Sequence, residues 1–274
     1  MKVDAADRGV LLFAGVILIL VLLAILAPVV APYSPDDQDL AKRFNPPLTP
    51  GHAFGTDHLG RDIVTRLIFG ARISLSVGTL AVLISGTVGT ALGVLSGYYG
   101  GVLDDVVNWF VNVQLAFPFI LLAISVIAVL GPSLVNMIIV LAIGGWPAYV
   151  RVVRAKVMVL KEVEFVEAVK AIGAGDSRIM FRHMFPNVAA PLIVLTSFEF
   201  AKMVIAEAAL SFLGLGPGSL EYSSWGLMLA EGKNYLAVAW WVATVPGLAI
   251  MIAVLSINIV GDWLRDRLDP KLQT

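Results

Sequence analysis

Residues 10–31 read VLLFAGVILILVLLAILAPVVA, a run without any charged or polar side chain. A helix needs about 20 apolar residues to cross the hydrocarbon core of a bilayer, so this stretch predicts a transmembrane helix. A cleavable secretory signal has a shorter apolar core, of roughly 7–15 residues, and a small-residue cleavage site. Here Pro32 directly follows the one cleavage site that fits, after Ala31. We therefore expect an uncleaved first span.

The composition of the whole chain agrees with a membrane protein. Of 274 residues, 58% are hydrophobic and 14% are charged, and the mean hydropathy is +0.88. Soluble domains carry about 25% charged residues. The net charge of −1 gives no electrostatic basis for binding nucleic acid. The absence of cysteine excludes disulfides, thiol catalysis and thiolate metal sites.

Six apolar segments are long enough to span a bilayer: residues 10–31, 73–97, 105–130, 133–157, 188–213 and 236–260. Backbone polar groups in lipid must be paired within the protein, which favours helices. The predicted fold is therefore all-α and polytopic, with six transmembrane helices.

Basic residues predict the orientation, because Lys and Arg are enriched in cytoplasmic loops. Residues 151–182 carry seven Lys and Arg, and both chain ends carry more. With six spans, these three regions lie on one side, so we expect cytoplasmic N- and C-termini. Residues 32–72 also carry five basic residues, although they fall on the opposite side. The number of spans and the larger 151–182 cluster decide the prediction.

Small residues recur every four positions in the second predicted span, at Ala81, Ser85, Gly89, Gly93 and Gly97. This spacing allows close helix–helix approach. The partner is either another helix of the same chain or a second subunit.

Residues 160–187, between the fourth and fifth predicted spans, are too polar to be buried in lipid. Helical spacing separates apolar and charged side chains onto two faces. The apolar face holds Phe165, Ala168, Val169 and Ile172, and the charged face holds Lys161, Glu164, Glu167 and Lys170. Gly173 predicts the end of this helix, because glycine accepts the left-handed conformation.

A second short helix is expected to follow, with Asp176 as its N-cap and Pro186 as its end. Arg178 and Arg182 share one face of it. Apolar side chains lie near them, namely Met180, Phe181, Met184 and Phe185. An apolar patch outside the bilayer predicts a protein partner or packing against the helix ends.

Glu167-Ala168, followed by Gly173 and Pro186, resembles the EAA signature of ABC-importer permease subunits. That signature reads Glu-Ala-Ala, three residues, Gly, nine residues, Ile-x-Leu-Pro; the differing positions here are Val169, His183 and Phe185. In that family the segment sits in a cleft of the ATPase subunit and transmits its motion, so we call residues 160–187 the coupling segment. The resemblance implies a coupling role for Glu167, Ala168, Gly173, Ala174, Asp176, Arg178, Arg182 and Pro186.

The resemblance extends over nearly the whole chain, to the C-type permease of the dipeptide, oligopeptide and nickel branch. The similar stretches are residues 54–62 (FGTDHLGRD), 70–75, 210–216 (LSFLGLG), 225–226, 258–262 (NIVGD) and 268–270, together with Glu207. One helix departs from the family pattern. Trp109 and Asn112 stand where Arg and Asp often occur, before Phe117 and Pro118.

The resemblance implies a type I ABC importer permease fold in the cytoplasmic membrane of a bacterium or archaeon. Its expected parts are residues 1–70 (first span and periplasmic segment), 71–262 (the permease domain) and 263–274 (a cytoplasmic tail). The implied partners are a homologous second permease, two ATPase subunits, a periplasmic or lipid-anchored substrate-binding protein, and membrane lipid. ATP and Mg would be used by the ATPase subunits.

Three charged residues fall within the fifth predicted span, where charges are costly and usually face a cavity or partner. Glu199 and Lys202 are three residues apart and can pair on one helix face. Either they form a local ion pair, or their face lines the translocation path. Glu207 is predicted to line the path or lie next to a gate.

No catalytic or metal site is predicted. Asp57, His58 and Asp62 are expected to make turn and cap contacts rather than to bind a metal. The sequence has no Gly-x-x-x-x-Gly-Lys phosphate loop, no nucleophile elbow and no zinc-ligand pair. We therefore expect no ATP hydrolysis and no cofactor in this chain itself.

Alternatives remain at this point. Peptides are the expected substrate, and nickel or a nickel chelate is the alternative within the same family. A different class would be an ion-coupled secondary transporter that uses Glu199, Lys202 and Glu207 as coupling charges. A membrane-embedded enzyme would need a polar catalytic constellation in the bilayer, which the sequence does not display.

Overall fold

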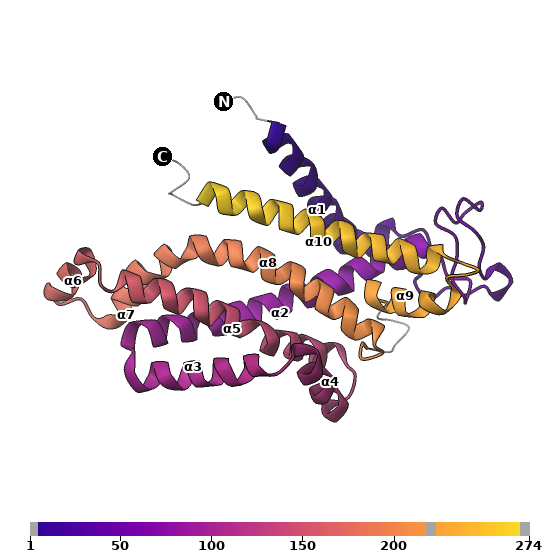
Figure 1. The fold of residues 1–274 in the computed structure, drawn as a ribbon. Coiled ribbons are helices and arrows are strands. Elements are labelled where there is room, and N and C mark those ends of the chain that lie inside the picture. Colours follow the sequence, from indigo (N-terminus) through magenta and orange to yellow (C-terminus); the bar gives the residue numbers. More distant parts are fainter. Residues whose placement is uncertain (1–4, 218–222, 269–274) are drawn as a thin grey trace.

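The computed structural model describes residues 5–217 and 223–268, and every regular element in these ranges is helical (Figure 1). The long helices are α1 (Ala5–Val30), α2 (Ile63–Tyr99), α3 (Gly101–Ala116), α4 (Phe119–Leu130), α5 (Leu134–Leu160), α8 (Phe185–Phe212) and α10 (Trp241–Leu268). The short helices are η1 (Leu40–Lys42), α6 (Glu164–Ala171), α7 (Asp176–Ile179), the π-helix η2 (Met180–Met184), α9 (Trp225–Gly232) and η3 (Lys233–Tyr235). The predicted all-α, polytopic fold is confirmed.

Five described helices are long and apolar enough to cross a bilayer, and the pair α3 and α4 adds a sixth if it is counted as one span. The prediction of a continuous third span over residues 105–130 is wrong, because α3 and α4 meet at an angle of 91°. At the break, Phe117 is extended (φ −95°, ψ 133°). Pro118 explains this, since proline lacks an amide hydrogen and disfavours helical backbone at the residue before it.

The sixth span also differs from its prediction of residues 236–260. Residues before Trp241 form a tight turn, in which the amides of Val238 and Ala239 donate to the carbonyl of Tyr235. The helix then continues past the apolar run to Leu268. Hydropathy shows where a helix leaves the apolar region, but it does not show where the helix ends, because charged residues can continue a helix in water. The predicted tail at 263–274 therefore begins inside α10.

Close packing of α2 along α5 forms the centre of the fold. A Cβ atom on Gly89 would lie 2.5 Å from the Trp146 carbonyl oxygen, and one on Gly93 would lie 2.8 Å from Cβ of Val153. A Cβ on Gly97 would also meet the α5 backbone. The small-residue pattern therefore serves packing within this chain, the first of the two alternatives.

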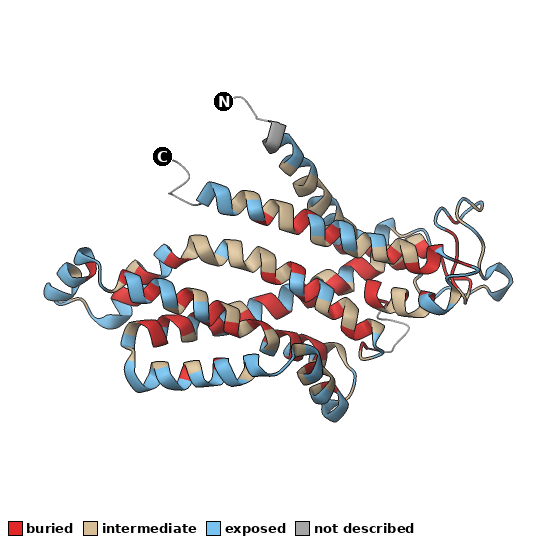
Figure 2. Ribbon diagram, viewed as in Figure 1, coloured by how far each residue is buried: buried red, intermediate tan, exposed pale blue. Residues whose placement is uncertain are grey.

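Helix α8 packs against α2 and α5, and α10 packs against α8, α9 and α1. Figure 2 shows buried residues along the facing sides of these helices, whereas α3 and α6 are largely exposed. Residues 31–62 and α9 lie at one end of the bundle, and α6 and α7 lie at the other (Figure 1). The C-terminal end of α10 points toward the end that carries α6 and α7.

Candidate functional site

Helix α6 of the coupling segment stops at Gly173, as predicted. Gly173 has a φ of +88°. Its amide donates to the Lys170 carbonyl (3.0 Å), and the Ala174 amide donates to the Val169 carbonyl (3.2 Å). These two bonds satisfy carbonyls at the helix end, and the left-handed backbone favours glycine. A Cβ on Gly173 would meet no atom within 4 Å, so the requirement for glycine is conformational rather than steric.

The second half of the coupling segment corrects two predictions. Asp176 is not an N-cap: Gly175 occupies that position, and Asp176 Oδ1 accepts a hydrogen bond from the Tyr98 hydroxyl (2.7 Å). Pro186 does not end the helix, because Asp176–Phe212 is one continuous helical run. The π-helix η2 ends just before Pro186 with the Phe185 amide donating to the Met180 carbonyl, and Pro186 stands in the first turn of α8, where proline is tolerated.

The inner face of the coupling segment is anchored to the ends of α2 and α5. Its buried side chains are Val166, Ile179, Met180 and Met184, which pack with Val94, Val153, Val157, Leu160 and Val188. Val169 and Ala174 are half-buried against the same cluster. The predicted apolar face is thus divided, because Val169 turns inward while its other members turn outward.

The outer face of the coupling segment presents large apolar side chains to solvent. Ile172 is 86% exposed and Phe181 is 76% exposed, and Phe165 and Phe185 are also exposed. The predicted coupling residues on this outer surface are Glu167, Ala168, Gly173, Asp176, Arg178, Arg182 and Pro186. Exposed large apolar side chains among charged residues are typical of a protein-docking site.

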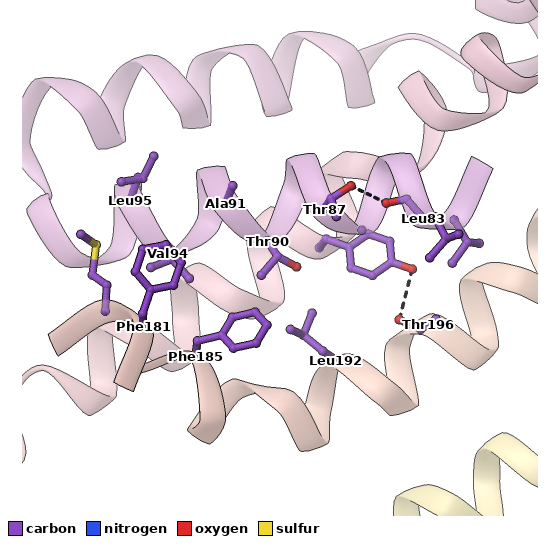
Figure 3. Close-up of a pocket in the computed structure, with 14 residues that line it drawn as sticks. Leu83, Thr87, Thr90, Ala91, Val94, Leu95, Phe181, Phe185, Leu192 and Thr196 are labelled. Carbon is purple, nitrogen blue, oxygen red and sulfur yellow. Dashed lines mark hydrogen bonds between the residues drawn. The ribbon is translucent and has the colours of Figure 1, made fainter. Parts of the chain in front are cut away.

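A pocket of about 440 Å³ lies beside the coupling segment, between α2 and the first turns of α8 (Figure 3). Leu83, Thr87 and Leu95 line it from α2, and Phe181 and Phe185 close it on the side of the coupling segment. The Tyr149 hydroxyl donates to Thr196 Oγ1 at 3.4 Å at one edge. The sequence did not predict this pocket, because its lining comes from segments that are far apart along the chain.

Two of the three intramembrane charges form the predicted local pair. Lys202 Nζ donates to Glu199 Oε1 (2.6 Å). The Glu199 side chain is buried, whereas the Lys202 side chain is 66% exposed. The second oxygen of Glu199 is buried without a hydrogen-bond partner in the described part of the chain. Most of the Lys202 side chain is therefore exposed on the surface of this subunit, within the apolar helix α8.

Glu207 lies in a different setting, between α8 and α2. It is 1% exposed. Its two carboxylate oxygens accept hydrogen bonds from the hydroxyls of Ser74 and Ser211, both at 2.8 Å. Because Ser74 belongs to α2, Glu207 links two helices inside this chain.

The opposite end of the bundle holds a buried ionic cluster centred on Asp57. Its carboxylate accepts hydrogen bonds from the side chains of Arg61 and Arg66, both at 2.6 Å. Glu231 of α9 pairs with the same two arginines at 3.0 and 2.8 Å. Burial opposes ionisation of Asp57, but Arg66, Arg61 and backbone amides outweigh it, so its pKa lies below the ordinary value.

The predicted turn and cap contacts are present for Asp57 and Asp62 but not for His58, whose ring stacks on Tyr235 and whose buried Nδ1 has no hydrogen-bond partner among the described residues. Asp57 also accepts from the amides of Leu59 and Arg61. Asp62 is the N-cap of α2, with the Thr65 amide at 2.7 Å, and it also holds His52 at 3.0 Å. Residues 31–62 are therefore ordered by their own polar side chains.

Asp57, His58 and Glu231 bring potential metal-ligand atoms within 4.8 Å of one another. However, Arg61 and Arg66 already bind both carboxylates, and their positive charge opposes a cation there. The chemistry of this cluster therefore favours ion pairing. Glu231 was missed from sequence because it lies 170 residues from Arg61, and no local pattern links such distant positions.

The fold is that of a permease subunit, an integral membrane protein built from repeated helical spans. Comparison with known families gives the same result. Residues 89–274 match the family described as "Binding-protein-dependent transport system inner membrane component", and residues 6–47 match "N-terminal TM domain of oligopeptide transport permease C". The chain belongs to this family of transport-system inner membrane components.

Individual relatives are similar over almost their full lengths. The chain is 42% identical to the dipeptide transport system permease protein DppC of Haemophilus influenzae, covering 97% of this chain and 92% of that protein. It is 45% identical to the di/tripeptide permease DppC of Pseudomonas aeruginosa, covering 98% and 90%. It is 40% identical to the glutathione permease GsiD of Pectobacterium atrosepticum, covering 94% and 85%.

A solved structure supports the fold. An inward-facing structure of the MetNI methionine ABC transporter matches with a TM-score of 0.59 and 21% identity, covering 74% of this chain and 96% of that chain. The expected type I permease fold is thereby confirmed. The chain is a multi-pass transport subunit of the inner membrane.

Proposed function

We propose that this chain is the C-type permease of an ATP-driven importer of di- and oligopeptides. The single observation that carries the proposal is the coupling segment, whose inner face is fixed to α2 and α5 while its outer face exposes Ile172 and Phe181. A docking loop needs both properties, because it must bind a partner and pass that partner's motion to the membrane helices. The peptide and glutathione substrates in the relatives' names support the substrate class.

In this proposal the chain forms half of the translocation path, and a homologous second permease forms the other half. Two ATPase subunits dock on the cytoplasmic side, one of them on the coupling segment, and they bind the ATP and Mg. A binding protein delivers the peptide to the opposite end. The N- and C-termini are cytoplasmic, and this chain binds no cofactor. The ion-coupled transporter considered above is not favoured, since the family is binding-protein-dependent.

The exposed side chain of Lys202 supports placing the translocation path along that face of α8. A lipid-facing ammonium group in the middle of a span costs several kcal/mol, of order 3 on insertion scales. The exposed Lys202 side chain should therefore face water or the second permease, with Glu199 holding it in place. Glu207 is proposed to act near a gate by fixing α8 to α2. Changing Glu207 to Gln should alter transport without blocking assembly, and unchanged transport would exclude this role.

Co-purification tests the central proposal. The tagged chain, extracted from its native membrane in mild detergent, should co-purify with a second permease and two ATPase subunits. The complex in proteoliposomes should import peptides only with ATP and a binding protein. Transport by the chain purified alone, driven by an ion gradient, would refute the proposal.

A further inference from the structure

Three long helices meet the coupling segment, but they are joined to it in different ways. Helix α5 leads into it at Leu160, and α8 leaves it at Phe185, so both are connected through the backbone. Helix α2 has no such connection, because its chain continues into α3. Motion of the coupling segment can therefore reach α2 indirectly, through α5 on which α2 packs, or directly, through side-chain contacts between the segment and α2.

The side-chain connection to α2 has an apolar part and a polar part. Val94 packs in the buried cluster with the inner face of the segment. One turn further along α2, the Tyr98 ring packs on the same cluster, and its hydroxyl donates to Asp176 Oδ1 at 2.7 Å. Apolar contacts slide at little cost, whereas a hydrogen bond to a carboxylate has a preferred direction and length.

Helix α2 is also the helix through which displacement would spread. Its glycines hold it against α5, and Ser74, in the first third of the helix, binds Glu207 of α8. A rigid shift of α2 at Tyr98 would therefore also displace the helices that pack against it, α5 and α8.

We propose that Tyr98 and Asp176 are a positioning pair that carries the movement of the coupling segment into α2. This inference rests on the proposed function, since it assumes that an ATPase moves the segment. It also assigns Asp176 a role within its own chain, in place of a cap or a direct ATPase contact.

The test uses the complete transporter in proteoliposomes, with peptide import and ATP hydrolysis measured together. Tyr98→Phe removes the hydroxyl alone and should raise the ATP hydrolysed per peptide by about three- to tenfold, as for loss of one hydrogen bond. Asp176→Ala should have the same effect. Asp176→Asn keeps an acceptor oxygen and should stay near the wild-type ratio. The double variant Tyr98→Phe with Asp176→Ala should be no worse than either single variant.

Tyr99→Phe is the matched control, because Tyr99 is its neighbour and is 53% exposed. It should leave the ratio unchanged. A wild-type ratio in Tyr98→Phe would overturn the inference, as would an equal fall in import and hydrolysis, which a purely structural role predicts. Retention of the ATPase subunits is checked in each preparation: their absence from the wild-type complex would refute the proposed function, whereas a normal complex with an unaffected Tyr98→Phe variant would refute this inference alone.

Discussion

The two ends of the bundle differ in how they place their arginines. At the end formed by residues 31–62 and α9, Asp57, Arg61 and Arg66 are buried and bind one another. At the coupling segment, Arg178, Arg182 and most large apolar side chains of the outer face are exposed. The arginines of the first end are paired within their own chain, whereas those of the second are exposed on its surface.

This difference teaches that exposure, more than residue type, separates structural from docking positions. Both ends contain arginines and acids, and both looked polar in sequence. Substitutions at the first end should therefore reduce the stability of this chain, and substitutions on the outer face of the second should reduce association.

The largest expected effect is at Asp57. Asp57→Ala leaves two buried arginines with Glu231 as their one carboxylate partner in the described cluster, and breaking such a cluster costs about 3–5 kcal/mol. Thermal unfolding in detergent should show this loss, and Asp36→Ala, at an exposed acid in the same loop, should not. The pKa of Asp57 in the folded protein lies below 3.8. The stabilisation that its charge gives to the fold is therefore complete above pH 3.8, and it is lost as the pH falls through the pKa of the folded protein. An Asp57→Ala variant as stable as the wild type would show that the buried cluster does not stabilise its end of the bundle.

A buried side chain of the coupling segment should come next. Met184 is fully buried, and Met184→Ala should cost about 2–5 kcal/mol by leaving a cavity. The measurement is again thermal unfolding of the purified complex. A small effect here would mean that the inner face of the segment is not firmly anchored.

Gly173→Val should have a moderate effect on stability and a larger one on coupling. The left-handed conformation costs a side chain about 1–2 kcal/mol, so α6 should end elsewhere and the segment should change shape. Peptide import should fall while ATP hydrolysis persists or the ATPase detaches. Gly175→Thr is the control, since Gly175 has a φ of −70°, a Cβ there meets no atom within 4 Å, and threonine, which has the shape of valine, is tolerated as well as glycine at this N-cap. Normal coupled transport in Gly173→Val would contradict the docking role.

The smallest effect on stability is expected at Phe181. Phe181→Ala removes an exposed ring, so the unfolding free energy should change by no more than about 0.5 kcal/mol. Retention of the ATPase subunits during purification should nevertheless fall. Phe110→Ala, at an exposed ring on α3, should leave that retention unchanged. If both variants retain the ATPase equally, the outer face is not the docking surface.

Much of the fold followed from local patterns. Apolar runs predicted the positions of α1, α2, α5 and α8, and Gly173 predicted the end of α6. Pattern reasoning failed where geometry depends on neighbouring structure. Pro118 breaks the third span sharply, whereas the helix continues through Pro186, which directly follows a π-helix. Both prolines follow a phenylalanine.

The candidate site, too, was predictable from the sequence only in part. The sequence alone determined that the chain crosses a membrane repeatedly and that residues 160–187 are amphipathic and resemble the EAA motif, because hydropathy, helical period and a motif are properties of adjacent residues. Only the tertiary structure decided that Asp176 meets Tyr98, that Glu231 completes the Asp57 cluster, and that Glu207 binds Ser74. These contacts join residues that are 78, 165 and 133 positions apart, counted for Tyr98–Asp176, Arg66–Glu231 and Ser74–Glu207. Their distances are set by how whole helices pack, which no local stretch of sequence specifies.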